Sequence, residues 1–229
     1  TEIYTLSLHD ALPISIPGRL EKIRHPLDRL MFVDYAHTPD ALNSILTTLK
    51  KRTPNRLITI FGCGGDRDRS KRPIMGSVVA RHSDLAIVTS DNPRTEDPDV
   101  IIRDILKGMD ETRRLSMEDL ARPPFKTGFL VEPDREKALN LAVHLSRTGD
   151  IIVAAGKGHE TYQITRERTL HFDDREQLGK AADRFLEQFT PIAWSTDDLS
   201  RALNLSPRLV PGDGNLFFTG ISTDSRTIR

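Results

Sequence analysis

The sequence predicts an α/β fold in which a mostly parallel sheet is covered by helices on both faces. Two observations favour this fold: short apolar runs rich in β-branched residues recur along the chain, and a helical pattern follows most of them. Strands that alternate with helices are typical of parallel sheets, because each crossover must return the chain to the same edge. A third observation is size, since 229 residues with 37% hydrophobic content allow one sizeable domain and a small additional piece.

Three strand and helix units open the predicted domain. The expected elements are strands at Leu30–Val33, Leu57–Phe61 and Leu85–Thr89, and helices after Asp40, at Lys71–Arg81 and at Pro98–Met109. In the first helix the apolar residues Ala41, Leu42, Ile45, Leu46 and Leu49 recur at helical spacing, which predicts a buried face. Before the second helix Ser70 is of the residue type preferred as an N-cap, and Pro73 is tolerated in the first turn.

The second half of the domain is expected to contain two strands, two helices and a hairpin. These elements are strands at Phe129–Val131 and Ile151–Ala155, helices at Asp134–Ser146 and Asp174–Phe189, and a hairpin over Tyr162–Phe172. The segment Asp110–Thr127 is polar and contains prolines, so we expect it to be a surface insertion.

The two ends of the chain differ from the predicted domain, which we place at residues 16–189. Residues 1–15 lack the basic start and apolar core of a signal peptide, and they resemble a translated adaptor or cloning artefact. After Thr190 and Pro191, which break the preceding helix, a short helix is expected from Ser195. Residues 190–229 are too few to bury much core, so we expect a short partial α+β tail.

Composition restricts the classes of partner and the compartment. The chain has 33 basic and 33 acidic residues, and this zero net charge argues against general nucleic-acid binding. No apolar run approaches the roughly 20 residues that a membrane-spanning helix needs. The single cysteine, Cys63, excludes an internal disulfide and is typical of a reducing compartment, so we expect a cytoplasmic protein.

Unusual loops follow four of the predicted strands. They are Asp34–Pro39, Gly62–Arg69, Asp91–Arg94 and Gly156–Glu160. In open α/β sheets, ligands bind outside the carboxyl ends of the strands, so we expect these loops to converge on one rim. The glycine-rich turn between a strand and a helix also favours an anion, because free backbone N–H groups point toward it.

The charges in these loops suit a ligand that carries both carboxylate and ammonium groups. Four arginines lie in or beside the loops: Arg67, Arg69, Arg72 and Arg94. Their planar guanidinium groups match carboxylates or phosphates, and Glu160 offers an acceptor for an ammonium group. A stiff turn at Asn92 and Pro93 would present Arg94. The sequence therefore indicates a zwitterionic ligand such as an amino acid, with ordinary surface ion pairs as the alternative.

Other polar residues near the loops carry weaker signals. His37 and His159 either contact a nucleotide or end a strand, and without further residues at metal-ligand spacing they do not predict a metal site. Lys157 could meet a phosphate, although Gly156 to Gly158 is not a P-loop. The dinucleotide fingerprint also fails, because Arg67 occupies its third glycine position.

A cysteine-dependent phosphatase is an alternative for the central loop. Cys63 and Arg69 stand at the Cys-x5-Arg spacing between a strand and a helix, where a thiolate would attack phosphorus. Asp66 and Asp68 argue against it, because their charges would repel a phosphate dianion. A third reading is a non-catalytic α/β module that only binds a ligand.

Five motifs together resemble the Mur ligase family, and specifically the C-terminal domain of its diaminopimelate-adding members. They are Asp34–Leu42, Phe61–Asp68, Lys71–Gly76, Asp91–Thr95 and Ala155–Glu160, and the resemblance covers roughly residues 16–189. It implies a Rossmann-like sheet and a cytoplasmic enzyme of peptidoglycan precursor synthesis. Such enzymes use ATP and Mg²⁺ to convert a carboxylate of UDP-N-acetylmuramoyl-L-alanyl-D-glutamate to an acyl phosphate, which the amine of meso-diaminopimelate then attacks.

The resemblance also assigns roles to individual residues. It implies meso-diaminopimelate contacts at Arg67, Asp91, Asn92, Pro93, Arg94, Gly156 and Glu160. It places Asp34, Tyr35 and His37 near the nucleotide. The sequence from Asp91 to Arg94 resembles the form found in meso-diaminopimelate enzymes rather than L-lysine enzymes. No catalytic residue is expected in this fragment, because the N-terminal and central domains, with the P-loop and the Mg²⁺ ligands, are missing, so it is not expected to be active alone.

The tail resembles a second member of the same family. Phe217 to Arg226 is similar to the beginning of the N-terminal domain of a Mur ligase, with the D-alanyl-D-alanine-adding enzyme as the best candidate. This resemblance implies a fusion of two ligases. A C-terminal extension specific to this protein is the alternative.

Overall fold

The computed structural model describes residues 16–27, 29–53, 55–121 and 126–188, and the two pairs 194–195 and 217–218. The artefact expected at residues 1–15 and the helix expected after Ser195 lie outside the described residues. The chain divides into two compact units, Thr1–Phe185 and Leu186–Arg229, which we describe separately. In the second unit, β9 (Trp194–Ser195) pairs antiparallel with β10 (Phe217–Phe218).

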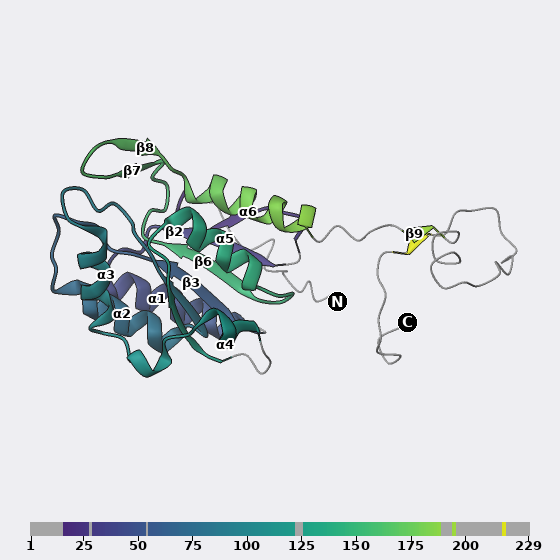
Figure 1. Ribbon diagram of the computed structural model, residues 1–229, viewed down its shortest axis with the longest axis horizontal. Coiled ribbons are helices and arrows are strands. Elements are labelled where there is room, and N and C mark those ends of the chain that lie inside the picture. Colours follow the sequence, from purple (N-terminus) through teal and green to yellow (C-terminus); the bar gives the residue numbers. More distant parts are fainter. Residues whose placement is uncertain are drawn as a thin grey trace, which may run out of the picture. The chain divides into compact units, whose positions relative to one another are not determined.

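A six-stranded sheet forms the centre of the first unit (Figure 1). Its strands are β1 (Glu21–Ile23), β2 (Leu30–Asp34), β3 (Leu57–Phe61), β4 (Leu85–Val88), β5 (Gly128–Val131) and β6 (Ile151–Ala155). They lie in the order β1-β2-β6-β3-β4-β5, and all neighbours are parallel except β1 and β2. The predicted mostly parallel sheet is therefore confirmed, with one antiparallel edge strand added.

Helices cover both faces of this sheet, as predicted. They are α1 (Pro39–Arg52), α2 (Lys71–His82), α3 (Pro98–Leu106), α4 (Met117–Ala121), α5 (Arg135–Leu145) and α6 (Asp174–Gln188), with a 3₁₀ turn at Glu111–Arg113. Figure 1 shows α5 and α6 on one side of the sheet and α1, α2 and α3 on the other. Among the described residues no helix has the length and the hydropathy to span a bilayer.

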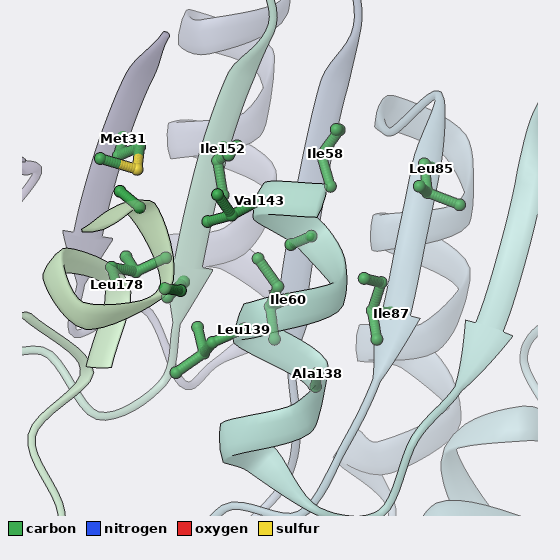
Figure 2. Close-up of a cluster of buried hydrophobic side chains, with 14 of the residues drawn as sticks. Met31, Ile58, Ile60, Leu85, Ile87, Ala138, Leu139, Val143, Ile152 and Leu178 are labelled. Carbon is green, nitrogen blue, oxygen red and sulfur yellow. The ribbon is translucent and has the colours of Figure 1, made fainter. Parts of the chain in front are cut away.

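The two faces of each central strand bury their side chains in separate cores. Ile58 and Ile60 of β3 pack with Leu139 and Val143 of α5, as Figure 2 shows. The alternate residues Leu57 and Phe61 belong to the core on the opposite face, together with residues of α1, α2 and α3. Because successive strand side chains point to opposite faces, a strand that is apolar throughout must be covered on both sides. These cores hold the carboxyl ends of β2, β3, β4 and β6 in fixed register.

Ser70 stands at the N-cap position of α2, as predicted, but it makes no side-chain capping bond, and its hydroxyl donates to Asp68 Oδ1 over 2.7 Å. One local prediction is wrong. The segment 110–127 is not only a surface insertion, since Leu120 is buried and Leu115 packs against the same core. The backbone N–H of Leu115 also donates to the carbonyl of Phe129 in β5 over 2.8 Å. Two leucines in a polar segment were sufficient to attach it to the core.

The predicted hairpin is confirmed as β7 (Tyr162–Ile164) paired antiparallel with β8 (Thr169–His171). It is a separate two-stranded sheet that follows the loop after β6. The backbone N–H of Arg94 donates to the carbonyl of Ile164 over 3.0 Å, and the Gln163 side chain donates to the carbonyl of Asp91 over 2.8 Å. The hairpin therefore holds the loop that follows β4.

Candidate functional site

The four unusual loops meet at one edge of the sheet, as predicted. The N–H of Gly156 donates to the carbonyl of Asp34 over 3.0 Å, which joins the loops after β6 and β2. The N–H of Gly65 donates to the carbonyl of Asn92 over 2.9 Å, which joins the loops after β3 and β4. Asn92 Nδ2 also donates to Glu160 Oε2 over 2.8 Å, so these bonds connect all four loops into one rim.

Asn92, in the loop after β4, is hydrogen-bonded to the loops after β3 and β6 and to the β7–β8 hairpin. Its side chain is buried, and Oδ1 accepts from the Ile164 backbone N–H at 2.9 Å and from Lys157 Nζ at 3.1 Å. Two donors at Oδ1 fix the orientation of the amide, so Nδ2 faces Glu160. The Glu160 side chain keeps 17% of its surface exposed and can meet a ligand from the solvent side.

Lys157 lies beneath this arrangement and has no exposed side-chain surface. Its Nζ is 3.5 Å from Asp91 Oδ1 and 3.7 Å from Glu160 Oε2. Burial lowers the pKa of Lys157, and the neighbouring Asp91 opposes that shift. The idea that Lys157 meets a phosphate is therefore wrong, because its ammonium group points into the protein and is occupied by protein oxygens.

Two of the four arginines do not have a free guanidinium for a ligand. Arg72 is fully buried and donates to Glu96, at 2.8 and 3.1 Å, and to Asp104 at 3.1 Å. Arg69 forms a 2.8 Å ion pair with the same Glu96. The Arg72 guanidinium is the main reason that the pKa of Glu96 is lowered to about 2. For Arg69 and Arg72, structural pairing replaces the ligand role that the sequence suggested.

Arg67 and Arg94 keep their guanidinium groups free of ion pairs within the part of the chain that the structure describes. Arg94 is partly buried, and its Nη1 donates to the carbonyl of Gly65 over 2.8 Å. A Cβ on Gly64 would lie 2.9 Å from that nitrogen, so the glycine lets the guanidinium lie against the loop. Arg67 is exposed and donates only to the carbonyl of Asp66, at 3.1 Å. These two arginines are therefore available for carboxylates.

Pro93 and Gly156 shape the rim through their backbones. Pro93 is buried, and its carbonyl accepts from the N–H of Glu96 over 3.0 Å. Gly156 has a φ of +115°, which residues with a side chain rarely adopt. A Cβ there would lie 3.6 Å from Asp91 Oδ2. Gly156 therefore lies close to the Asp91 side chain, and Pro93 lies between Asn92 and Arg94 in the loop after β4.

A hollow of about 550 Å³ adjoins the loop after β2. Its lining includes Asp34, Tyr35 and His37, together with Arg19, which carried no motif and which the sequence did not single out. The rings of Tyr35 and His37 lie 4.6 Å apart in an edge-to-face arrangement, and the His159 ring lies 5.1 Å from Tyr35. Aromatic and basic groups around one hollow can stack on a base and pair with phosphate.

Asp34 has a different part in this hollow from its neighbours. Its carboxylate accepts from the backbone N–H groups of Leu20 and Ala36, each at 2.7 Å. Burial raises the pKa of Asp34, while those two bonds oppose the shift. Asp34 therefore ties the segment before β1 to the loop after β2, and Tyr35 and His37 remain for contact with a ligand.

The phosphatase alternative is wrong. Cys63 is only 2% exposed, and its Sγ lies 3.6 Å from Met75 Sδ. Burial raises the pKa of Cys63 to about 12, so the thiol stays protonated at neutral pH and is not a nucleophile. Within the described ranges, no group of three or more His, Cys, Asp or Glu side chains is arranged to hold a metal ion.

Comparison with known proteins agrees with the fold and identifies a family. The sequence pattern of the Mur ligase glutamate ligase domain matches residues 18–158. The UDP-N-acetylmuramoyl-L-alanyl-D-glutamate–2,6-diaminopimelate ligase of Syntrophomonas wolfei is 50% identical over 161 residues, which are 70% of this chain and 30% of that enzyme. The enzyme of the same name from Geobacter metallireducens is 48% identical over 170 residues, or 73% of this chain and 33% of the enzyme.

A solved structure of a UDP-N-acetylmuramoyl-L-alanyl-D-glutamate–2,6-diaminopimelate ligase is 42% identical and superimposes with a TM-score of 0.64. The superposition covers 75% of this chain and 32% of that protein. This chain thus spans about a third of the length of the relatives it matches. The chain belongs to the Mur ligase family, and residues 18–158 are its glutamate ligase domain.

Proposed function

We propose that this chain is the amino-acid-binding domain of an ATP-dependent ligase that adds meso-diaminopimelate to UDP-N-acetylmuramoyl-L-alanyl-D-glutamate. The names of the relatives support this proposal, because both curated enzymes described above are diaminopimelate ligases. The observation that carries it is that, in the described part of the chain, two arginines without ion pairs and one oriented carboxylate lie in loops of the same rim. A binding module without catalysis is the alternative.

The ligand matches the rim group by group. Diaminopimelate carries two carboxylates and two ammonium groups, and Arg67 and Arg94 supply guanidinium groups for the carboxylates. Glu160, held by Asn92, supplies the acceptor for an ammonium group. L-lysine lacks the second carboxylate, so it would leave one arginine without a partner. This difference is the physical basis on which the site would prefer meso-diaminopimelate.

In the proposed reaction this chain orients the incoming amino acid. ATP converts the dipeptide carboxylate to an acyl phosphate, and the amine of the amino acid attacks its carbonyl carbon with release of phosphate. Holding the amino acid by its charged groups directs one amine toward that carbon, and such positioning supplies a large part of many rate enhancements. We propose that the Mg²⁺ ligands belong to the central domain of the intact enzyme.

We also propose that the hollow beside β2 holds part of ATP. Tyr35 and His37 would contact the base or ribose, and Arg19 lies where a guanidinium can meet phosphate oxygens. The ring contact between Tyr35 and His159 links this hollow to the loop after β6. A cytoplasmic location is part of the proposal, because a single free cysteine fits a reducing compartment.

Calorimetric titration of the chain tests the main proposal. Meso-diaminopimelate should bind at least about tenfold more tightly than L-lysine, since one guanidinium–carboxylate pair contributes more than about 1.4 kcal/mol. Arg94→Ala should remove this preference and leave the weak L-lysine affinity unchanged. The matched control is Arg166→Ala, because Arg166 donates to the Thr95 carbonyl from the hairpin. Equal affinities for both ligands in the unmodified chain, or no binding at all, would contradict the proposal.

For residues 190–229 we propose the beginning of a second Mur ligase N-terminal domain. The support is the sequence from Phe217 to Arg226, which resembles the start of the D-alanyl-D-alanine-adding enzyme. Sequencing the source gene beyond Arg229 tests this proposal, because a fusion predicts the P-loop of a second ligase downstream. A stop codon shortly after Arg229 would contradict it.

A further inference from the structure

The ammonium group of Lys157 lies between side chains from three parts of the rim. Its Nζ contacts Asp91 and Asn92 in the loop after β4 and Glu160 in its own loop, at 3.5, 3.1 and 3.7 Å. On another side, Nζ lies 5.8 Å from the ring centre of Tyr162 in the hairpin. A fully buried lysine that reaches no solvent cannot itself contact a ligand, so its effect must pass through these neighbours.

The backbone conformation on both sides of Lys157 restricts the direction of its side chain. Gly158 has a φ of +54°, and a Cβ there would lie 2.6 Å from the Cβ of Tyr35. The chain is therefore pressed against the loop after β2, in a conformation that suits glycine. Between two glycines with positive φ, Lys157 is directed inward from a fixed backbone.

Lys157 is one of three groups that fix which end of the Asn92 amide faces Glu160, together with the Ile164 N–H and Glu160 itself. If the amide were turned over, Oδ1 would face the Glu160 carboxylate, and Nδ2 would face the Ile164 N–H and the Lys157 ammonium group. That orientation sets acceptor against acceptor and donor against donor, so it loses all three hydrogen bonds that Asn92 makes. Without Lys157 the amide would be held at Oδ1 by the Ile164 N–H alone.

The charges below the rim point to the same role. Asp91 and Glu160 are two carboxylates close to one ammonium group, that of Lys157. Arg135 and Asp174, the next charged groups, are both fully buried and neutralise each other through bonds of 2.6 and 2.8 Å. With Lys157 present, these five groups carry one net negative charge, which a single ligand ammonium would neutralise. Without it they would carry two, and Asp91 and Glu160 would lose the ammonium group that lies 3.5 and 3.7 Å from them.

We propose that Lys157 is a positioning residue that fixes the Asn92 amide and, through it, holds the Glu160 carboxylate ready for the ammonium group of the amino acid. This role rests on the proposed function, and it assigns the ammonium selectivity of the site to a residue that the ligand does not touch. Removing Lys157 should therefore weaken the binding of ligands that carry an ammonium group. It should leave the binding of ligands that carry only carboxylates nearly unchanged.

The test compares the unmodified chain with Lys157→Met, which keeps the length of the side chain and removes its charge and donors. The control is Lys50→Met, which removes another paired lysine, the partner of Asp84. Two ligands are titrated: meso-diaminopimelate and pimelate, which has the same two carboxylates and no ammonium group. Nitrogen-15 spectra of the ligand-free proteins record the Asn92 side-chain amide and the Ile164 backbone amide.

We expect Lys157→Met to lower the affinity for meso-diaminopimelate by about tenfold or more, as loss of one charge-assisted contact predicts. The affinity for pimelate should change by less than about twofold. The Asn92 and Ile164 amide signals should move in Lys157→Met and stay in place in Lys50→Met. Equal weakening of both ligands, or unmoved amide signals, would overturn the proposal. If the unmodified chain bound neither ligand, the proposed function would fail, while the ligand-free spectra would still decide whether Lys157 holds Asn92.

A second measurement needs no variant, in case Lys157→Met does not fold. In the unmodified chain labelled at lysine nitrogens, the Lys157 ammonium protons should exchange slowly with solvent and show contacts to Asn92 and Tyr162. The exposed Lys180 ammonium group provides the fast-exchanging reference. Exchange at Lys157 as fast as at Lys180 would overturn the proposal.

Discussion

Arg94, which we propose binds a ligand carboxylate, has an unfavourable backbone conformation. Its φ is +52°, which costs a residue with a Cβ roughly 1–2 kcal/mol relative to glycine. The N–H of Arg94 donates to Ile164, and its Nη1 donates to Gly65, so two contacts hold it in this conformation. Strained residues of this kind are concentrated at binding sites, where the surrounding structure maintains them. The strain directs the guanidinium along the loop after β3.

Replacing Arg94 separates the backbone effect from the side-chain effect. Arg94→Gly should be more stable than Arg94→Ala by about 1 kcal/mol, because glycine adopts the positive φ without strain. Both variants should lose the preference for meso-diaminopimelate equally. Urea unfolding measures the first difference and calorimetry the second. If Arg94→Ala were the more stable of the two, the backbone at this position would not be strained.

The sequence predicted that the loops carrying Asn92, Arg94 and Glu160 meet at one rim, and the structure confirms this meeting. Their contact with a ligand stays a prediction, and the bonding partners of the neighbouring charged residues were not predicted. The bonds of Arg72 to Glu96 and of Lys157 to Asn92 were not predicted, because these partners lie 24 and 65 positions away and such a pairing requires the folded register. The identity of an arginine in the sequence does not show whether its guanidinium binds a ligand or another residue such as Glu96.

At the scale of elements, Glu96 joins the loop after β3 to the loop after β4. Its carboxylate accepts from the N–H of Asp66 at 2.6 Å and from the side chains of Arg69 and Arg72 at 2.8 Å. Asp66 in turn accepts from the Thr95 hydroxyl at 2.7 Å. These bonds hold together the two loops that carry Arg67 and Arg94, so the geometry of the ligand site depends on a residue outside it.

The Glu96 network predicts a specific acid sensitivity. Because the pKa of Glu96 is lowered from 4.5 to about 2, chiefly by Arg72, its stabilising effect is complete above pH 4.5. This stabilisation is lost as the pH falls toward 2, since the unfolded chain takes up the proton first. Glu96→Gln should therefore be less stable at neutral pH and less sensitive to acid over that range.

Urea unfolding at several pH values between neutrality and 3 measures this effect. The control is Glu167→Gln, because Glu167 is an exposed residue in the hairpin turn. The pH dependence of this variant's stability should match that of the unmodified chain. Parallel stability curves for Glu96→Gln and the unmodified chain would show that the Glu96 pairs contribute nothing to folding.

The helices α5 and α6 are joined by two ion pairs in very different surroundings. Arg135 and Asp174 are both fully buried, whereas Glu136 and Arg184 are about half exposed. Asp174→Asn leaves the Arg135 charge buried without a counter-ion, and we expect a loss of about 3–5 kcal/mol. Glu136→Gln, the matched control, should cost about 1 kcal/mol or less. Similar losses in the two variants, measured by urea unfolding, would contradict the importance of burial.

The sequence predicted the five parallel strands of the sheet, but it did not predict the antiparallel edge strand β1. Long apolar runs such as Leu57–Phe61 identify buried parallel strands, because both faces need apolar side chains. β1 was missed, since Glu21 to Ile23 has three half-buried residues and only one of them is apolar. It becomes a strand by pairing with β2, which local sequence does not encode.

At the scale of the whole molecule, the fold explains why distant segments form one site. Parallel strands β2, β6, β3 and β4 are neighbours, so their carboxyl ends deliver four loops to the same edge. The order in the sheet differs from the order in sequence, and it places the loop after β6 between those after β2 and β3. Lys157 can therefore reach Asn92, which lies 65 positions earlier in the chain.

We propose that this rim binds meso-diaminopimelate, and the most informative single measurement maps the backbone amide signals of the chain during titration with this ligand. We expect the moving signals to belong to Gly62–Arg69, Asp91–Thr95, Gly156–Glu160 and the β7–β8 hairpin, while those at the opposite edge of the sheet stay in place. Movement confined to other parts of the chain, or no movement in these loops at saturating ligand, would contradict it.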